Sequence, residues 1–140
     1  MPLSDVIRIL VADDHPVVRD GLVAALEAEP DLMVVGEAGT GREAVERALA
    51  LRPDVILMDL EMPNMDGVEA LRALRAEEPA AKVIVFTAFD TDERILAAVQ
   101  AGAQGYLLKG VPREEIARAV RIVHGGGSLL QPVVANKLLR

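Results

Sequence analysis

The sequence has no cysteine and very few aromatic residues. Without cysteine it can form no disulfide, no thiolate metal site and no thiol nucleophile. With two Phe, one Tyr and no Trp, the core must be built from Val, Leu, Ile and Ala. Such a core suits a parallel sheet that is covered by helices on both faces.

A long apolar run and a block of basic residues are also missing. No apolar run approaches the roughly 20 residues that cross a bilayer, and Met1–Asp5 lacks the basic and apolar regions of a signal peptide. We therefore expect a cytoplasmic protein with no membrane contact. The net charge is −7, whereas a domain that grips nucleic acid through its phosphates is usually basic. Direct DNA binding by these residues is therefore not expected.

What the chain does contain is an alternation of short apolar runs and amphipathic stretches. Its 140 residues, 51% apolar and 26% charged, are typical of one globular domain. The apolar runs are Val6–Ala12, Met33–Ala38, Val55–Met58, Val83–Phe86 and Tyr106–Leu108. Five helices are expected between and after these runs: one beginning after His15 with Pro16 in its first turn, one over Arg42–Leu51, one beginning after Gly67, one over Asp92–Ala101 and one from near Pro112 to Gly125. In the second of these, Ala44, Val45, Ala48 and Leu49 are expected to face inward. The alternation predicts consecutive βαβ units and an α/β fold.

Polar residues follow four of these five apolar runs at the point where each strand should end. They are Asp13-Asp14, Asp59, Thr87 and Lys109. Parallel α/β sheets bind ligands at the carboxyl edge of their strands, so these side chains are expected to converge there. Carboxylates, a hydroxyl and an ammonium are the groups needed to bind a divalent cation and move a phosphoryl group.

The carboxylates divide into a cation-binding role and a nucleophilic role. Mg²⁺ prefers oxygen ligands and uses one or two carboxylates, a demand that Asp14, Asp59 and a nearby carbonyl would meet. By itself the pair Asp13-Asp14 is read more simply as a helix cap beside a solvated acid. With Asp59 at another strand end, a cation site is the favoured interpretation. Asp59 is also placed to accept a phosphoryl group covalently, with Lys109 as a point charge for phosphate oxygens and Thr87 as a hydroxyl donor.

These residues resemble those of response-regulator receiver domains. The motifs that carry the resemblance are ILVADDH (9–15), ILMDLEMPNMDG (56–67), VIVFTA (83–88) and GAQGYLLKG (102–110). The resemblance covers Val6 to about Gly125. It implies a CheY-like, flavodoxin-like (βα)5 fold, a doubly wound five-stranded parallel sheet of strand order 2-1-3-4-5. It also implies Mg²⁺ as the cofactor and a sensor histidine kinase as the phosphoryl donor.

The same resemblance assigns roles to individual residues. It implies Asp59 as phosphoacceptor, Thr87 as switch hydroxyl, Lys109 as phosphate partner and Tyr106 as switch aromatic. The metal ligands it implies are Asp13, Asp14, the Asp59 carboxylate and the Glu61 backbone carbonyl. On this reading the domain is a switch and not an enzyme, apart from slow autodephosphorylation. Phosphorylation would alter one of two surfaces and so control homodimerisation. One surface consists of the fourth helix, the fifth strand and the fifth helix, and the other consists of the first and fifth helices.

The phrases VADDHPVVRDGL, GYLLKG and HGGGSLLQP are most similar to the NarL/FixJ, or LuxR-type, class. Members of that class commonly carry a C-terminal helix-turn-helix DNA-binding domain, so the expected output is transcription through a domain outside these residues. We expect a receiver domain over 1–125 and a linker over 126–140, with a short helix starting near Pro132. The alternative for that tail is a native terminal helix.

One departure from the family pattern concerns the residue after Lys109. Many receivers have proline there, often with a cis bond, whereas this chain has Gly110. A non-proline cis bond costs about 2.5–4 kcal/mol, which leaves the isomer of the Lys109–Gly110 bond open.

Other signals in the sequence have competing interpretations. Residues 36–43 (GEAGTGRE) have the glycine spacing of a P-loop, but Arg42 and Glu43 replace the Lys and Ser/Thr, so we expect a simple strand-to-helix turn. His124 is expected at a helix C-terminus, where a cation is favourable. For His15 a place at the edge of the site is the alternative to a plain surface residue. For Tyr106 core packing is the alternative to a switch role.

Two other functions compete with the phosphorylated switch. One is a receiver-like scaffold that works without phosphorylation, against which the complete set of Asp, Thr and Lys argues. The other is a small Mg²⁺-dependent phosphatase with Glu61 as general acid, which would need a cap domain or substrate pocket that the sequence does not contain. Multiple turnover on a phosphate ester would distinguish the phosphatase from the switch.

Overall fold

The computed structural model describes residues 6–88 and 91–130. Its strands and helices alternate along the chain as the apolar pattern predicts. They are β1 (Ile7–Ala12), α1 (Pro16–Glu27), β2 (Leu32–Ala38), α2 (Gly41–Leu51), β3 (Val55–Met58), α3 (Gly67–Glu77), β4 (Val83–Thr87), α4 (Asp92–Gln100), β5 (Gly105–Leu108), α5 (Arg113–His124) and β6 (Leu129–Leu130). The predicted boundaries differ from these by at most one residue, within the usual variation of helix and strand ends.

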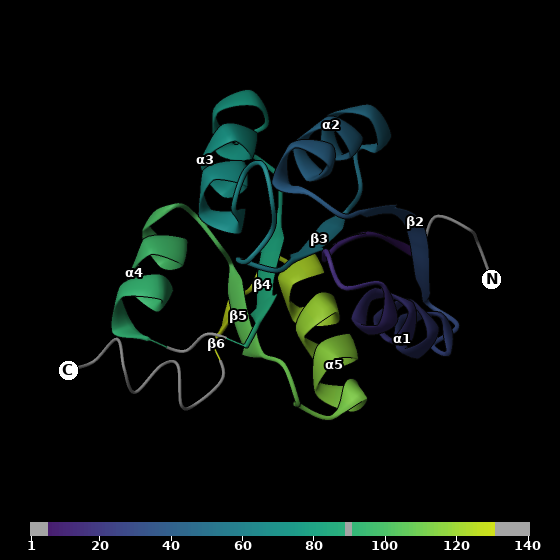
Figure 1. Ribbon diagram of the computed structural model, residues 1–140. Helices are drawn as coiled ribbons and strands as arrows, with labels where there is room; N and C mark the ends of the chain where they lie inside the picture. Colours follow the sequence, from purple (N-terminus) through teal and green to yellow (C-terminus); the bar gives the residue numbers. More distant parts are fainter. Residues whose placement is uncertain (1–5, 89–90, 131–140) are drawn as a thin grey trace.

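The strands form one parallel sheet of order β2-β1-β3-β4-β5-β6 (Figure 1). The predicted order 2-1-3-4-5 is therefore confirmed. A two-residue strand, β6, extends the sheet by pairing Gly105 with Leu129 and Tyr106 with Leu130. From the sequence this segment is expected to be part of a linker, because two apolar residues are too few to predict a strand. The short helix expected near Pro132 lies outside the described residues.

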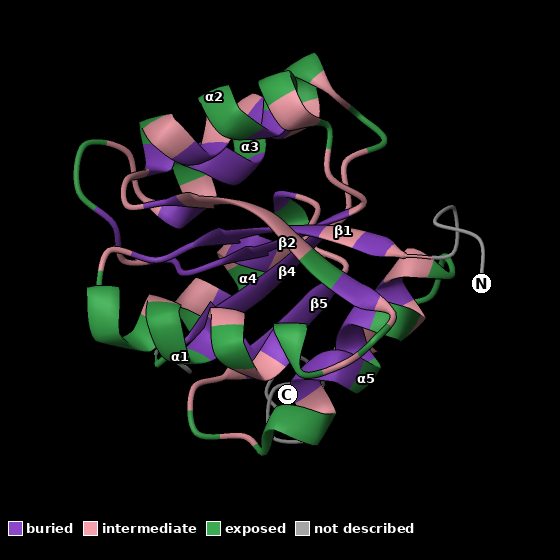
Figure 2. Cartoon of the chain, turned by 90° about the vertical axis from the view of Figure 1, so that its right-hand side faces the viewer, coloured by how far each residue is buried: buried purple, intermediate pink, exposed green. Residues whose placement is uncertain are grey.

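Alternate residues of each strand point to opposite faces of the sheet, and the two faces have separate cores. Ile9 and Val11 pack with α1 and α5, whereas Leu10 and Ala12 pack with α2 and α3. Figure 2 shows the buried sheet between these two helical layers. A third cluster joins α4 to the sheet through Val85, Ile95 and Tyr106 among others. Strands β1, β3, β4 and β5 are almost entirely buried, as expected for a parallel sheet covered on both sides, whereas the edge strand β2 is mostly half-buried.

Local sequence explains how several helices begin. Pro16 opens α1, where its missing N–H costs nothing. Thr40 accepts a hydrogen bond from the Glu43 N–H at 3.0 Å, and Glu43 accepts one from the Gly39 N–H at 2.7 Å. These reciprocal caps make the P-loop-like stretch a strand-to-helix turn, as predicted. Asp66 caps α3 through the Glu69 N–H at 2.9 Å.

One inward-facing residue in α2 was predicted wrongly. Leu49 is 38% exposed. Leu51 packs against the core of that face instead, together with Val45, Ala44 and Ala48. The helix begins at Gly41, one residue earlier than predicted, and the apolar stripe was assigned one position too far around it.

Candidate functional site

The carboxyl ends of β1 and β3 bring two aspartates together. The Asp13 N–H donates to the Ala38 carbonyl at 2.9 Å, and the Asp59 N–H donates to the Ala12 carbonyl at 3.0 Å. These hydrogen bonds extend the sheet by one residue at each strand end. Because β1 lies between β2 and β3, the two carboxylates meet at the same edge, as predicted.

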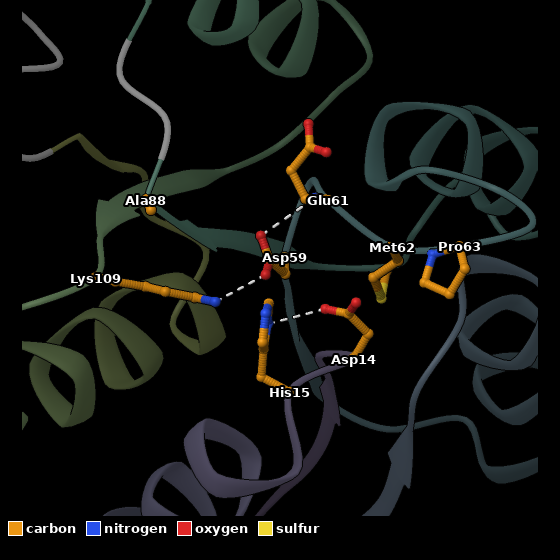
Figure 3. Close-up of a pocket in the computed structure, with 8 residues that line it drawn as sticks. All are labelled: Asp14, His15, Asp59, Glu61, Met62, Pro63, Ala88 and Lys109. Carbon is orange, nitrogen blue, oxygen red and sulfur yellow. Dashed lines mark hydrogen bonds and ion pairs between the residues drawn. The ribbon is translucent and has the colours of Figure 1, made fainter.

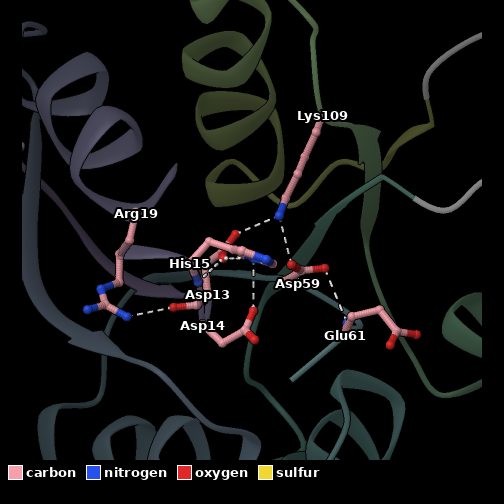
Figure 4. Close-up of polar contacts among 7 residues, drawn as sticks. All are labelled: Asp13, Asp14, His15, Arg19, Asp59, Glu61 and Lys109. Carbon is pink, nitrogen blue, oxygen red and sulfur yellow. Dashed lines mark hydrogen bonds and ion pairs between the residues drawn. The ribbon is translucent and has the colours of Figure 1, made fainter. Parts of the chain in front are cut away.

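Lys109 reaches this edge from the end of β5. Its backbone N–H donates to the Thr87 carbonyl at 2.7 Å. Its Nζ lies 2.8 Å from Asp59 Oδ2 and 2.9 Å from Asp13 Oδ2, so one ammonium bridges two carboxylates (Figure 4). The Asp13 and Asp59 side chains are only 2% and 3% exposed. A buried charge needs such a partner, because removal from water otherwise costs several kcal/mol.

The environment of Lys109 shifts its pKa in two opposing ways. Burial favours the neutral amine and lowers the pKa, while hydrogen bonds to Asp59 and Asp13 favour the ammonium and raise it. The hydrogen bonds and the attraction to the two carboxylates outweigh burial, and the pKa of Lys109 is raised. The lysine is therefore a permanent cation of the site at neutral pH.

His15 and Arg19 complete the polar surroundings of Asp13. The His15 N–H donates to Asp13 Oδ1 at 2.8 Å, and His15 Nδ1 lies 3.0 Å from Asp14 Oδ1. Arg19 Nη1 donates to the Asp13 carbonyl at 2.7 Å, while its Nε donates to Glu37 at 3.1 Å. Sequence reasoning considered a site-edge role for His15 but missed Arg19. Its role follows from the packing of α1 beside the end of β2, for which the sequence carries no motif.

Glu61 takes part in the site through its backbone. Its N–H donates to Asp59 Oδ1 at 3.2 Å. Its carboxylate is turned away to Arg94 on α4, with Oε1 2.5 Å from Arg94 Nη2. The two functions considered for this residue therefore involve different atoms, a backbone carbonyl for a metal and a side-chain acid for a phosphatase. The acid is engaged in an ion pair.

Thr87 and Tyr106 are both fully buried at the neighbouring strands. Thr87 ends β4, and Tyr106 lies in β5 beside Val85. The Tyr106 ring belongs to the apolar cluster with Leu60, Ile95 and Ala98, between the sheet and α4. The aromatic ring thus lies inside the core in this structure.

The site opens to solvent through a depression of about 570 Å³ (Figure 3). Its lining residues are Asp14, His15, Asp59, Glu61, Met62, Pro63, Ala88 and Lys109. Asp59 and Lys109 lie at its base, and loop residues from 61 to 63 form one wall. A phosphate-sized group can enter this depression and approach the Asp59 carboxylate.

The donor set fits a small divalent cation. One ligand atom from each of Asp13, Asp14, His15 and Asp59 lies within 4.8 Å of the others. Asp13 Oδ2 and Asp14 Oδ1 are buried, and within residues 6–88 and 91–130 they face the Lys109 ammonium at 2.9 Å and His15 Nδ1 at 3.0 Å, respectively. Clustered carboxylates of this kind repel one another, and a bound cation relieves the repulsion.

The backbone around Lys109 answers the question left open by the sequence. Within the described ranges no peptide bond is cis, so the Lys109–Gly110 bond is trans. Gly110 adopts φ of 103°, a conformation that L side chains rarely take.

No described helix is both long and apolar enough to cross a bilayer.

Comparison with known proteins gives a consistent picture. Residues 9–121 match the response regulator receiver domain family. The transcriptional regulatory protein LiaR of Bacillus subtilis is 48% identical over 133 residues, which are 95% of this chain and 63% of LiaR. The DNA-binding transcriptional activator DevR/DosR of Mycobacterium tuberculosis is 43% identical over 133 residues, 95% of this chain and 61% of that protein. The chain therefore spans about three fifths of the length of these curated relatives.

Solved structures agree in fold and in class. A LuxR-family two-component response regulator from Aurantimonas superposes with a TM-score of 0.91 at 34% identity, covering 96% of each chain. The signal receiver domain of a protein named NarL from Mycobacterium tuberculosis gives a TM-score of 0.84 at 41% identity, covering 87% of this chain and 98% of that one. These likenesses confirm the resemblance drawn from the sequence motifs. The chain belongs to the response regulator receiver family of two-component systems, in its NarL/LuxR class.

Proposed function

We propose that Asp59 accepts a phosphoryl group from a phosphohistidine on a sensor histidine kinase, and that this modification switches the receiver. The observation that carries the proposal is the position of the Asp59 carboxylate. It lies at the base of an open depression, beside a bridging ammonium and within 4.8 Å of three other cation-binding side chains. A buried carboxylate serving only as a structural partner would not need solvent access or two further acids beside it.

The proposed step is an in-line transfer. A P–O bond forms between the Asp59 carboxylate and phosphorus while the P–N bond of the phosphohistidine breaks. The electron pair of that bond returns to the imidazole nitrogen, which takes up a proton. Lys109 stabilises the negative charge on the transferred group, because its Nζ already lies 2.8 Å from Asp59 Oδ2. The Glu61 N–H is a second donor, 3.2 Å from the other carboxylate oxygen.

The residues that would hold Mg²⁺ are Asp13, Asp14, Asp59 and the Glu61 backbone carbonyl. A bound Mg²⁺ supplies neutralisation of the charge that develops on the transferred phosphoryl oxygens. Arg19 keeps the Asp13 backbone in place through its 2.7 Å hydrogen bond. Without the cation, Lys109 is the only Lys or Arg side chain among the described residues at ion-pair distance from Asp13 and Asp59.

Phosphorylation would change the balance of charges on which the resting arrangement depends. An acylphosphate would compete with Asp13 for Lys109 and draw the Thr87 hydroxyl toward it. Tyr106 would respond through its packing against α4, and the surface of α4, β5 and α5, or that of α1 and α5, would change shape. Such a change would control homodimerisation.

The output of this switch is proposed to be transcription. LiaR and DevR/DosR are named as transcriptional regulators, and both are longer than this chain. On this proposal residues 1–125 are the receiver and residues 126–140 lead to a helix-turn-helix DNA-binding domain outside the sequence. A net charge of −7 supports a DNA contact made elsewhere.

The test is intact-mass measurement after incubation with acetyl phosphate and Mg²⁺, using the wild type and Asp59→Asn. Asp20→Asn is the matched control, because Asp20 is an exposed acid on α1 that does not line the depression. A single Mg²⁺-dependent phosphoryl adduct is expected in the wild type and the control and not in Asp59→Asn. A sizing column run in parallel reports any dimer.

The same experiment separates the alternatives. Equal labelling of Asp59→Asn would contradict the assignment of the phosphoacceptor. An absence of adduct in all three proteins would favour the scaffold that works without phosphorylation. Repeated turnover of a phosphate ester would favour a phosphatase, although the Glu61 carboxylate is paired with Arg94.

A further inference from the structure

His15 brings an imidazole nitrogen into the acidic cluster. Its Nδ1 lies 3.0 Å from Asp14 Oδ1 and 3.4 Å from Asp13 Oδ1. Figure 4 shows the ring beside these carboxylates, on the side of the cluster that also faces Asp59. His15 also lines the depression through which the site opens to solvent.

The position of this ring is set by the backbone. The His15 N–H donates to Asp13 Oδ1 at 2.8 Å, which ties the residue to the first acid of the pair. Pro16 follows at the first position of α1 and fixes the chain direction. Although His15 occupies the N-cap position, its side chain makes no capping hydrogen bond among the described residues. The ring is thus directed to the carboxylates and not to the start of the helix.

The chemistry of this donor set differs from that of a purely acidic site. Mg²⁺ is a hard cation that prefers oxygen ligands and keeps several waters. Imidazole suits divalent transition ions, whose affinity for nitrogen-containing sites generally rises from Mn²⁺ through Co²⁺ to Ni²⁺. Three carboxylates with one imidazole therefore match a transition ion better than Mg²⁺.

A second observation shows that the cluster is prepared for a ligand. The Asp13 side chain is 2% exposed, and among the described residues its Oδ2 is paired with the Lys109 ammonium at 2.9 Å. An ionised carboxylate has about four lone-pair sites, so the contact with Lys109 leaves Asp13 able to bind a cation as well. The His15 side chain, 63% exposed, leaves an open route by which an ion can exchange.

We propose that His15 is a cation ligand through its Nδ1 and a determinant of cation choice, so that the site binds Mn²⁺ or Co²⁺ in preference to Mg²⁺. This inference rests on the proposed metal site of Asp13, Asp14 and Asp59 and adds a fourth protein ligand to it. The phosphoryl transfer proposed above does not depend on His15.

The test measures metal binding directly, without a phosphoryl donor. Mn²⁺ is titrated into the chain and followed by electron paramagnetic resonance, with Mg²⁺ as competitor. The proteins are the wild type, His15→Ala, and His124→Ala, the matched control. His124 is the only other histidine and lies at the end of α5. Pulsed measurements on the bound Mn²⁺ detect coupling to a ligand ¹⁴N nucleus.

The wild type and His124→Ala are expected to show ¹⁴N coupling and to bind Mn²⁺ about tenfold more tightly than His15→Ala. The affinity for Mg²⁺ should change less than about twofold, since Mg²⁺ gains little from a nitrogen donor. Loss of the ¹⁴N signal in His15→Ala alone would identify the ligand, and circular dichroism establishes that this variant is folded.

Two results would overturn the inference in distinguishable ways. Tight Mn²⁺ binding without ¹⁴N coupling, equal in the wild type and His15→Ala, would remove His15 as a ligand and leave the carboxylate site intact. Absence of binding for both Mn²⁺ and Mg²⁺ in the wild type would overturn the metal site itself, and the proposed Mg²⁺ dependence with it.

Discussion

Lys109 Nζ lies 2.8 Å from Asp59 Oδ2, although 50 residues separate the two in sequence. The same ammonium lies 2.9 Å from Asp13 Oδ2. Both carboxylates are almost completely buried, so in the metal-free protein Lys109 is their internal counter-ion. This arrangement ties the stability of the fold to the occupancy of the site.

Replacing Lys109 should make that link measurable. Lys109→Met leaves two buried carboxylates without a counter-ion. In the absence of metal we expect the free energy of unfolding to fall by about 3 kcal/mol. This value is the lower end of the range for a broken buried ion pair, because Lys109 is partly exposed. Mg²⁺ should restore much of this loss in urea unfolding curves. Lys82→Met is the control, since Lys82 Nζ donates to the His124 carbonyl and pairs with no carboxylate of the described residues. Equal Mg²⁺ responses of the two variants would contradict the counter-ion role.

The raised pKa of Lys109 predicts a loss of stability in alkali. The folded-state pKa lies above the unfolded value of 10.5. Such a group contributes stability that is fully present below the unfolded pKa and is lost as the pH rises through the folded pKa. The difference in unfolding free energy between the wild type and Lys109→Met should therefore shrink above about pH 10.5. A difference that stays constant from pH 7 to 12 would show that the lysine does not interact as an ammonium.

An ion-pair cluster away from the site predicts a contribution to the free energy of unfolding that is lost in acid. Arg121 on α5 donates to Asp31 at 2.8 Å twice and to Glu29 at 2.6 Å, joining α5 to the turn between α1 and β2. The hydrogen bond from Arg121 is the largest cause that lowers the pKa of Asp31. A lowered folded-state pKa contributes stability above the unfolded value of 3.8, and that stability is lost as the pH falls through the folded value.

Arg121→Gln should therefore destabilise the protein at pH 7 but not at pH 2. The expected loss is below about 1 kcal/mol, because the groups are largely exposed and water screens them. Thermal unfolding at the two pH values measures it. Arg118→Gln is the control, since within the part of the chain that the structure describes Arg118 pairs with Glu115 of the same helix, at 3.4 Å. A loss that is the same at both pH values would point to packing and not to charge.

Two glycines give a matched prediction on backbone space. A Cβ at Gly67 would lie 2.4 Å from the Asp59 carbonyl oxygen and 2.6 Å from Leu60 Cα. Gly67→Ala must therefore displace the segment that carries Asp59, at a cost of about 1–3 kcal/mol. Gly21, exposed on α1, has no described atom within 4 Å of such a Cβ, and Gly21→Ala should stabilise the helix by about 0.5–1 kcal/mol.

Urea unfolding of both variants, with metal titration of Gly67→Ala, tests this pair. Gly67→Ala should lose affinity for Mg²⁺ as well as stability, because Asp59 and Leu60 move together. Unchanged stability and metal affinity in Gly67→Ala would mean that the β3–α3 connection adjusts freely.

The fold was predictable because each element carries its own local signal. The apolar runs that form β1, β3 and β4 are bounded by turn residues and polar ends. Short continuous apolar runs of this kind are typical of strands in a parallel sheet that is buried on both faces. The strand β6 was not predictable. Its two residues are held by hydrogen bonds to β5, a contact that exists only once the sheet has formed. Leu49 was misassigned for a related reason, since the inward face of α2 depends on where the helix starts and how it packs on its neighbours.

By itself the sequence determined which polar residues meet at the carboxyl edge of the sheet. Acids after β1 and β3, Thr87 after an apolar run and Lys109 after another can be read from the chain, because side chains at the carboxyl ends of parallel strands share one edge. Only the tertiary structure decided how these charges are paired. It placed Lys109 between Asp13 and Asp59, Arg19 on the Asp13 carbonyl and the Glu61 carboxylate on Arg94. Such pairings depend on distances of a few ångströms between elements far apart in sequence, and these distances follow from packing rather than from local pattern.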